Sequence, residues 1–155
     1  MRWEGDAPPA PRWADLPRRP PVPTDEGTDV LTSDELRSRI SDYVEAVNSR
    51  RADRVAALFA EDAVMADPAS NPAKVGRAAI EAFFADGIGA SDSWTFSAER
   101  VHTCADHVAV DFRIDVETGG SAMTIQGIEV FVAGEDGLFT SIHAYWDEAD
   151  LTIGQ

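Results

Sequence analysis

The carboxyl group of Glu129 stands at a position where the neighbouring residues of the same strand face are apolar. Over the run from Met123 to Phe131, Glu129 alternates in phase with Met123, Ile125 and Phe131. Alternate residues of a strand share one face, so this pattern predicts a carboxyl group on the buried face. A buried carboxyl group without a cationic partner keeps its proton and is then a hydrogen-bond donor.

Tyr43 and Asp67 are the two other residues whose chemistry fits a pocket with Glu129. Tyr43 shares an apolar helical stripe with Ile40, which predicts that its ring faces the interior. Asp67 ends a short apolar run, where Pro68 stops further strand pairing. A phenol, a protonated acid and an ionised carboxylate suit proton transfer next to a carbonyl group. The base removes a carbon proton, and the two donors stabilise the charge that develops on the oxygen.

Each of these residues also has a purely structural interpretation. Tyr43 fits a core tyrosine whose hydroxyl group bonds to the backbone, and Asp67 before a proline fits a turn. Glu129 becomes exposed if its strand is short and lies near an edge. The site interpretation therefore depends on all three side chains meeting in one pocket.

The elements that must position these residues change their period at about Ser93. Before Ser93, apolar residues recur as they do on helices. After Ser93 they alternate with polar residues, as in antiparallel strands with one wet face, and glycine-rich turns separate the runs. We predict a helix after an N-cap at Ser33, helices over 52–60 and over 77–85 before Gly87, a strand over 63–66, and strands over 108–117, 123–131 and 138–146.

Helices followed by a strand meander predict an α+β fold. In this fold, three helices pack in a strongly bent antiparallel sheet that encloses one apolar cavity. With 155 residues and 44% apolar content, the chain is expected to form one core. Residues 1–31 hold seven of the nine prolines, so we predict a mobile proline-rich tail there and one folded domain over residues 32–155.

The composition restricts the partners and cofactors. The formal net charge of -15 argues against nucleic acid and anionic membranes, because phosphate binding requires clustered Lys and Arg. The N-terminal region lacks the apolar segment of a secretion signal, so we expect a cytoplasmic protein. The single cysteine, Cys104, excludes an internal disulfide and fits a packed core residue. His102, His107 and His143 lack the spacing of metal ligands, so we predict neither a metal nor another cofactor.

Several runs of the chain resemble bacterial Δ5-3-ketosteroid isomerase. They are Tyr43 to Asn48, Ala56 to Ala63, Asp67-Pro68 and Gly76 to Ile80, and the two later hairpins extend the resemblance over residues 36–148. The resemblance implies the cone-shaped SnoaL-like fold, a homodimer and a small apolar carbonyl ligand such as a steroid. It also implies a reaction, in which a proton moves from C4 to C6 of a Δ5-3-ketosteroid through a dienolate.

The resemblance implies a role for each candidate residue. Tyr43 matches the family's oxyanion-hole tyrosine, Asp67 its proton-shuttling base and Glu129 its protonated oxyanion-hole aspartate. Four further positions match residues of the steroid cavity: Phe84, Phe112, Ile142 and Trp146. Two departures matter. Glu129 is one methylene longer than the family's aspartate, and Phe84 replaces a tyrosine that in some members supports the oxyanion-hole tyrosine.

Two other functions stay open. Arg113 and Asp115 resemble the Arg-x-Asp pair of limonene-type epoxide hydrolases, but Ala144 stands where those enzymes carry a second aspartate, and the strand period turns the pair towards solvent. The run from Ala144 to Thr152 resembles the ends of polyether-forming epoxide-opening cyclases, which also use carboxyl groups as acid and base. A steroid or lipid binder without catalytic activity is the third alternative.

Overall fold

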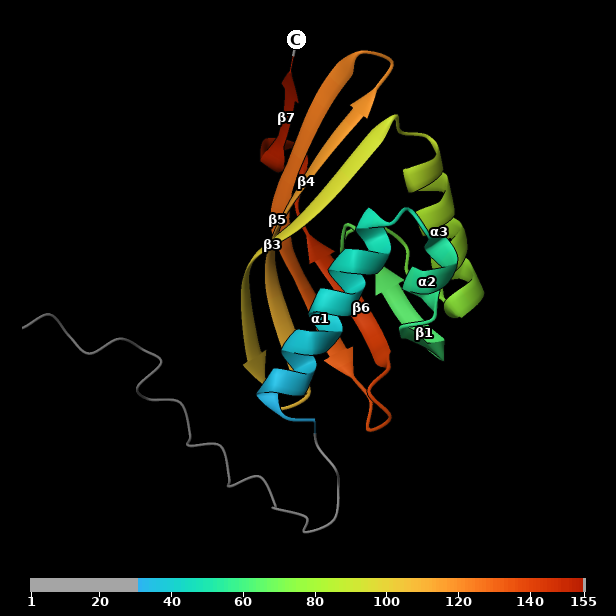
Figure 1. Ribbon diagram of the computed structural model, residues 1–155, viewed down its shortest axis with the longest axis vertical. Helices are drawn as coiled ribbons and strands as arrows, with labels where there is room; N and C mark the ends of the chain where they lie inside the picture. Colours follow the sequence, from blue (N-terminus) through green and yellow to red (C-terminus); the bar gives the residue numbers. More distant parts are fainter. Residues whose placement is uncertain (1–30, 155) are drawn as a thin grey trace, which may run out of the picture.

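A curved, seven-stranded sheet wraps around three helices, which gives the predicted cone-shaped α+β fold (Figure 1). The computed structural model describes residues 31–154. The predicted tail lies outside this range, except for Leu31, which packs against the core. The helices are α1 (Ser33–Asn48), α2 (Ala52–Ala56) and α3 (Arg77–Gly89), and a short 3-10 helix, η2, covers Glu148–Asp150. The strands are β1 (Phe59–Ala66), β2 (Lys74–Val75), β3 (Ser93–Cys104), β4 (His107–Thr118), β5 (Ser121–Ala133), β6 (Phe139–Tyr145) and β7 (Leu151–Gly154).

The sheet is mixed rather than wholly antiparallel, which corrects one prediction. Its strand order is β2-β1-β6-β5-β4-β3, and β7 pairs with β5. All neighbours pair antiparallel except β1 and β6, which run parallel with Met65 opposite Ile142. The period of apolar residues gives the face of a strand but not its direction, so it could not distinguish the two pairings. The parallel pair brings the end of β1 beside the end of β6.

Helix α1 begins one residue earlier than predicted, because the N-cap is Thr32 and not Ser33. The Thr32 hydroxyl oxygen accepts from the Glu35 amide at 3.2 Å, and the Glu35 carboxylate accepts from the Thr32 amide at 2.7 Å. This capping box pairs amide donors that the helix itself leaves free. The buried face of α1 consists of Leu36, Ile40, Tyr43, Ala46 and Val47, so the predicted stripe is confirmed.

Two other helix boundaries differ from the prediction. Helix α2 ends at Ala56 and β1 begins at Phe59, where a helix to residue 60 was expected. The apolar residues there fit both periods, and pairing of Phe59 with Phe139 decides in favour of a strand. Helix α3 continues through Gly87 to Gly89. Gly87 lies beneath the ring of Trp94, since an added Cβ atom would lie 3.9 Å from that ring.

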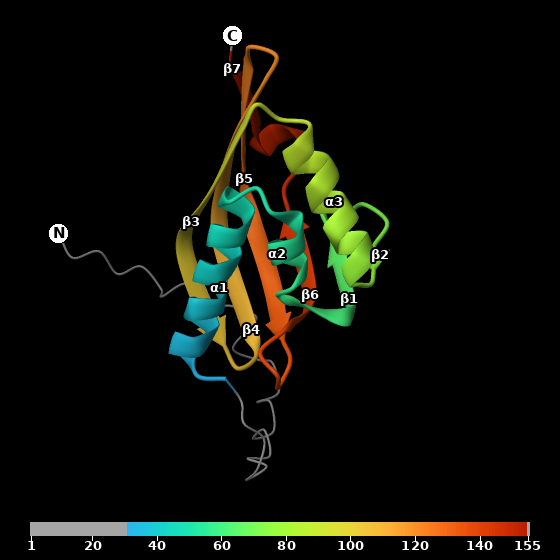
Figure 2. The same ribbon diagram turned by 45° about the vertical axis from the view of Figure 1, so that its right-hand side comes forward.

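The three predicted strands of the meander correspond to β4, β5 and β6. Together with β3, whose bounds were not predicted, they form a meander behind the helices (Figure 2). Inward-facing residues of β4 are all buried: Val108, Val110, Phe112, Ile114 and Val116. The β4–β5 turn places Gly119 and Gly120 at positive φ, the conformation that a tight hairpin requires. A second glycine, Gly127 on β5, permits a close approach. An added Cβ there would lie 2.5 Å from the Tyr145 carbonyl oxygen and 2.9 Å from the Trp146 Cβ.

Aromatic rings surround Tyr43 at the centre of the core. Four phenylalanine rings from α3, β1, β3 and β5 meet the Tyr43 ring edge to face at 5.0–6.5 Å between centroids: Phe59, Phe84, Phe96 and Phe131. Each such pair contributes about 0.5–1.5 kcal/mol beyond its buried area. The cluster fixes the Tyr43 ring, and its hydroxyl group therefore has a defined direction.

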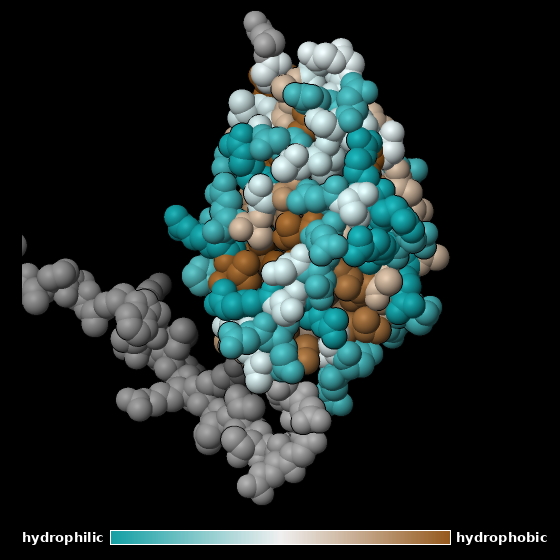
Figure 3. Space-filling view, viewed as in Figure 1, coloured by the Kyte–Doolittle hydropathy of each residue, from teal (hydrophilic) through white to brown (hydrophobic). Residues whose placement is uncertain are grey.

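The surface is mainly hydrophilic, with apolar patches between charged side chains on the face that Figure 3 presents. Arg113 and Asp115 lie on the outer face of β4 and pair at 2.7 Å with side chains 41% and 44% exposed, as predicted. Cys104 is exposed and not a core residue, because it ends β3 beside the turn at Ala105. No helix within residues 31–154 is long and apolar enough to cross a membrane.

Candidate active site

A cavity of about 240 Å³ opens between the helices and the inner face of the sheet. Tyr43 of α1, Asp67 after β1 and Glu129 of β5 contribute its main polar groups. Most of the remaining wall is apolar, and it includes Phe83, Phe84, Phe96, Ile114, Ile125 and Trp146. The three predicted catalytic side chains thus meet in one mostly apolar cavity, the arrangement that small-molecule sites usually have.

Glu129 occupies the middle of the sheet, where its side chain is 2% exposed. Its strand neighbours are Val110 on β4 and Ala144 on β6, so the strand is not at an edge. The Tyr43 hydroxyl group lies 3.5 Å from Glu129 Oε1, a long hydrogen bond. Glu129 Oε2 has no hydrogen-bond partner among residues 31–154. Glu129 is also one of the residues that line the cavity.

The surroundings of Glu129 and Tyr43 favour the protonated form of both groups. Burial raises the pKa of the Glu129 carboxyl well above its usual range, the negative charge of Asp67 raises it further, and the hydrogen bond with Tyr43 opposes the shift. Burial also raises the pKa of the Tyr43 phenol well above its usual value. Negative charge on Glu129 and on Asp67 raises it further. Both groups therefore retain their protons to higher pH than exposed ones do.

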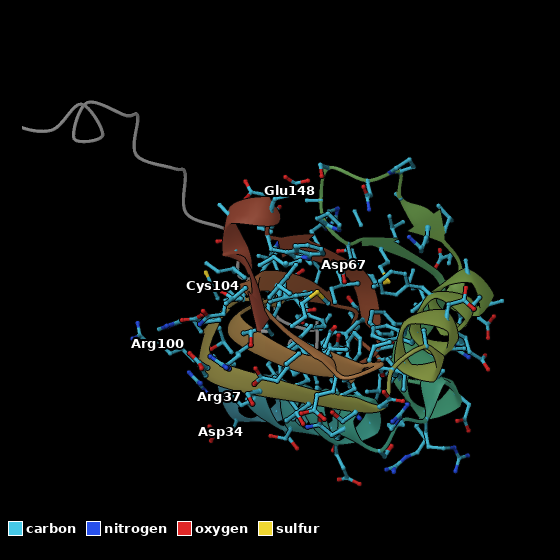
Figure 4. The ribbon with its side chains drawn as sticks, turned by 90° about the horizontal axis from the view of Figure 1, so that it is seen from above. Asp34, Arg37, Asp67, Arg100, Cys104 and Glu148 are labelled. Carbon is cyan, nitrogen blue, oxygen red and sulfur yellow. The ribbon has the colours of Figure 1, made fainter. Side chains whose placement is uncertain are left out.

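Asp67 has different surroundings from Glu129. It follows the last residue of β1 and is partly buried, and Figure 4 shows it in the interior, whereas Arg37, Arg100 and Glu148 lie at the periphery. The indole N–H of Trp146 donates to Asp67 Oδ1 at 2.7 Å. Burial raises the pKa of Asp67, while the Trp146 hydrogen bond and the positive charge of Lys74 lower it. Its ionised form is thus stabilised by two groups that Glu129 lacks.

Five of the seven predicted site residues line the cavity: Tyr43, Asp67, Phe84, Glu129 and Trp146. Phe112 and Ile142 do not line it, and this corrects the prediction that both do. Phe112 lies behind the wall, stacked on Phe96 at 5.7 Å with 15° between the ring planes. Ile142 is fully buried in the core. The strand period gives the face on which a residue lies but not its distance from the cavity.

Ten further residues of the wall were not predicted as site residues, among them Asn71, Phe83 and Trp94. Phe83 belongs to the apolar side of α3, which was its signal in the sequence. Trp94 is the second residue of β3, and its indole N–H is buried without a partner among the described residues. The Trp146 bond to Asp67 was also missed, since these residues are far apart in the sequence. Within residues 31–154, no group of three or more His, Cys, Asp or Glu side chains is arranged to hold a metal ion.

Comparison with known proteins identifies the family. A SnoaL-like domain matches residues 40–142. The chain is 33% identical over 121 residues to a steroid Delta-isomerase of Nocardioides simplex, a match that covers 78% of this chain and 97% of that protein.

Solved structures share the fold at lower identity. An epoxide hydrolase/cyclase-like enzyme, SalBIII, with a role in pyran ring formation in the polyether salinomycin, superposes with a TM-score of 0.72 at 21% identity, covering 78% of this chain and 97% of that one. A protein of Mycobacterium tuberculosis gives a TM-score of 0.73 at 23% identity, covering 80% of this chain and 99% of that one. A computationally designed 17-OHP binder gives 0.70 at 18% identity, with 78% and 97% covered. The chain belongs to the SnoaL-like family, as a relative of the steroid Delta-isomerases.

Proposed function

We propose that this protein is a Δ5-3-ketosteroid isomerase that moves a proton from C4 to C6 through a dienolate. The observation that carries the proposal is the buried Glu129 carboxyl group beside the Tyr43 hydroxyl group, in the same cavity as the separate carboxyl group of Asp67. The related steroid Delta-isomerase supports the same reaction. Asp67 is the base, and Tyr43 and Glu129 are the two donors to the carbonyl oxygen.

The reaction follows from the different surroundings of the two carboxyl groups. When substrate binds, the Tyr43 hydroxyl group turns its one proton from Glu129 Oε1 to the substrate carbonyl oxygen. The same oxygen accepts a second hydrogen bond from the protonated Glu129 carboxyl group. Ionised Asp67 removes the C4 proton, and the electron pair moves towards the carbonyl oxygen to form the dienolate. Asp67 then returns the same proton to C6, so no proton is gained or lost. Fixed donors in an apolar cavity stabilise the dienolate charge more strongly than water does.

Glutamate at position 129 changes the geometry of the donor pair. The longer side chain reaches further into the cavity than an aspartate would, and Oε2 is left free while Oε1 meets Tyr43. We assign Oε2 as the atom that donates to the ligand. With Phe84 beside the Tyr43 ring in place of a tyrosine, Glu129 is the partner of the Tyr43 hydroxyl group within the described residues.

The direct test is an ultraviolet assay with a β,γ-unsaturated 3-ketosteroid, whose product is a conjugated enone with a strong new absorption band. The wild-type protein should produce the band. Asp67→Asn should slow turnover by about a thousandfold, yet still bind a phenolic steroid, because a phenolate resembles the dienolate. Asp62→Asn is the matched control and should keep full activity, because Asp62 is an exposed aspartate of β1, the strand that leads to Asp67. Near-native turnover by Asp67→Asn would reject Asp67 as the base.

Opening of an epoxide is the second candidate function. One specific observation favours it: a base carboxylate and a protonated carboxyl group share one cavity. The same pair could activate water and protonate an epoxide oxygen. Turnover of an epoxide with no enone formation would support this candidate. Tight steroid binding with no turnover of either substrate would favour a binder.

The proposal includes a homodimer, as the family resemblance implies. Ile128 and Tyr145 are cross-strand neighbours on the outer face of β5 and β6, and they are 48% and 54% exposed. An exposed apolar pair of this kind suits a contact with a second copy. Light scattering should give twice the chain mass for the wild-type protein and a smaller mass for Ile128→Asp. A wild-type monomer at micromolar concentration would reject the dimer.

A further inference from the structure

Lys74 is the only lysine of a chain with a net charge of -15, and it lies beside the cavity. It occupies the two-residue strand β2, where it pairs with Met65 of β1, and β1 leads directly into Asp67. Its Nζ atom lies 4.6 Å from the centroid of the Phe83 ring, and Phe83 belongs to the cavity wall. An ammonium group over an aromatic face is held there by attraction to the ring.

The charge of Lys74 is not used in an ion pair. Four arginines pair with carboxylates at 2.7–3.0 Å: Arg51, Arg54, Arg77 and Arg113. Lys74, by contrast, has no carboxylate within 4.0 Å among residues 31–154. Lys74 pairs with Met65, two residues before Asp67, and its positive charge lowers the Asp67 pKa.

Asp67 requires such a charge because its other neighbours give only limited help. Trp146 donates one neutral hydrogen bond from the segment after β6. Glu129 of β5 and Tyr43 of α1 face the same cavity, and protonated forms of these groups carry no compensating charge. Burial in the cavity wall favours the neutral acid form of Asp67, and a neutral Asp67 cannot accept a carbon proton.

We propose that Lys74 is a positioning residue for the base: it holds a positive charge on the Phe83 ring, near enough to keep Asp67 ionised and too far to pair with it. The inference rests on the proposed function of Asp67. Separation matters because a contact ion pair would fix the carboxylate in one place, whereas the base must reach two carbon atoms. A charge that acts through space stabilises the anion and leaves the side chain free to move.

The test compares three variants by the pH dependence of kcat/KM on a β,γ-unsaturated 3-ketosteroid at low ionic strength. Lys74→Met keeps the length of the side chain but removes the charge, and Lys74→Arg keeps the charge. Arg100→Met, at the periphery of the molecule (Figure 4), removes one positive charge elsewhere and controls for net charge. Circular dichroism of each variant checks the fold.

The acidic limb should distinguish these variants. In Lys74→Met its midpoint should rise by about half a pH unit, which is about a threefold loss of kcat/KM on the acidic side. Lys74→Arg and Arg100→Met should match the wild-type midpoint. Added salt should raise the wild-type midpoint and leave that of Lys74→Met in place, because salt screens the charge that only the wild type has.

Equal midpoints for Lys74→Met and the wild type would overturn the inference. So would a loss of activity that is uniform across pH, because that loss would indicate a structural role or a direct ligand contact. A second readout separates this inference from the proposed function. The carboxyl carbon of Asp67, followed by ¹³C NMR, should titrate at higher pH in Lys74→Met whether or not the steroid is turned over. Absence of steroid turnover would reject the proposed function, and an unchanged Asp67 titration would reject the role of Lys74.

Discussion

The two carboxyl groups of the cavity differ in what surrounds them, and the difference determines the chemistry that each can perform. Glu129 lies in the middle of the sheet with a long hydrogen bond from Tyr43 and no partner for its second oxygen within the described residues. Asp67 lies at a strand end with a short hydrogen bond from Trp146 and the charge of Lys74 nearby. The electrostatic effect acts in one direction only. Ionised Asp67 raises the pKa of Glu129, whereas a neutral Glu129 has no charge that could shift the pKa of Asp67.

A third carboxyl group, on the outer face of the same sheet, completes the comparison. Asp115 accepts two hydrogen bonds from Arg113 at 2.7 and 2.8 Å and one from Thr124 at 2.6 Å. The hydrogen bond of Arg113 and that of Thr124 lower the Asp115 pKa. The hydrogen bonds on the outer face of β4 thus favour the anionic form of Asp115, whereas burial on the inner face of β5 favours the protonated form of Glu129.

After Asp67→Asn, the largest effect among the changes that test this comparison should come from removing the donor function of Glu129. Glu129→Ala should lower kcat by about a hundredfold, because one of two oxyanion donors is lost. Glu129→Gln should lose less, since the amide still donates a hydrogen bond, and less than Asp67→Asn loses. Steady-state kinetics with the enone assay gives both values. A larger loss in Glu129→Gln than in Asp67→Asn would reverse the assigned roles.

Removing the hydrogen bond to Asp67 should have a smaller and pH-dependent effect. Trp146→Phe keeps an aromatic ring in the wall but loses the N–H that lowers the Asp67 pKa. The Asp67 pKa should rise, and because the base must be ionised, the acidic limb of kcat/KM should move to higher pH. A hydrogen bond to a charged group implies a loss of about tenfold below that limb. Trp94→Phe is the control, because Trp94 lies in the same wall without a bond to Asp67, and it should leave the acidic limb of kcat/KM in place. The same midpoint of this limb in the wild type and both variants would show that the Trp146 hydrogen bond does not affect the base.

The buried acid also predicts how stability depends on pH. The folded-state pKa of Glu129 is raised, so its contribution to stability is fully present below the ordinary carboxyl pKa and is lost as pH rises through the raised value. Glu129→Gln removes this loss, because an amide does not ionise. The free energy of unfolding of the variant relative to the wild type should therefore increase with pH, as chemical denaturation at several pH values would measure. Glu135→Gln, which removes an exposed carboxyl group instead, is the control for the loss of one acidic side chain.

Deletion of residues 1–30 should have the smallest effect. Within residues 31–154, the cavity wall is formed by residues between Tyr43 and Trp146. We therefore expect kcat and KM to stay within about twofold of the full chain, as for a surface change remote from the site. A collapse of activity in the shortened chain, with its fold intact by circular dichroism, would show that the N-terminal segment takes part in the site.

The sequence predicted the inner face correctly because alternation over β4 and β5 is continuous and unambiguous. The burial of Glu129 follows from that alternation alone. Prediction failed where the apolar residues fit two periods, as at Leu58 and Phe59, and where the outcome depends on partners far along the chain. The parallel pairing of β1 with β6 and the bond from Trp146 to Asp67 are of this second kind. The prediction that Phe112 and Ile142 line the cavity failed for a third reason, because the periodicity of a strand does not give the distance of a residue from the cavity.

Gly127 has a consequence for the distance between the acid and the base. The chain beyond β6 crosses β5 at this residue, where no side chain holds the two segments apart. Glu129 is two residues further along one segment, and Trp146, which bonds Asp67, belongs to the other. A single extra methyl group at position 127 would therefore push the indole and the carboxylate it anchors away from the proton donor. The spacing of the proposed acid and base, Glu129 and Asp67, thus depends on a residue that contributes no functional group of its own.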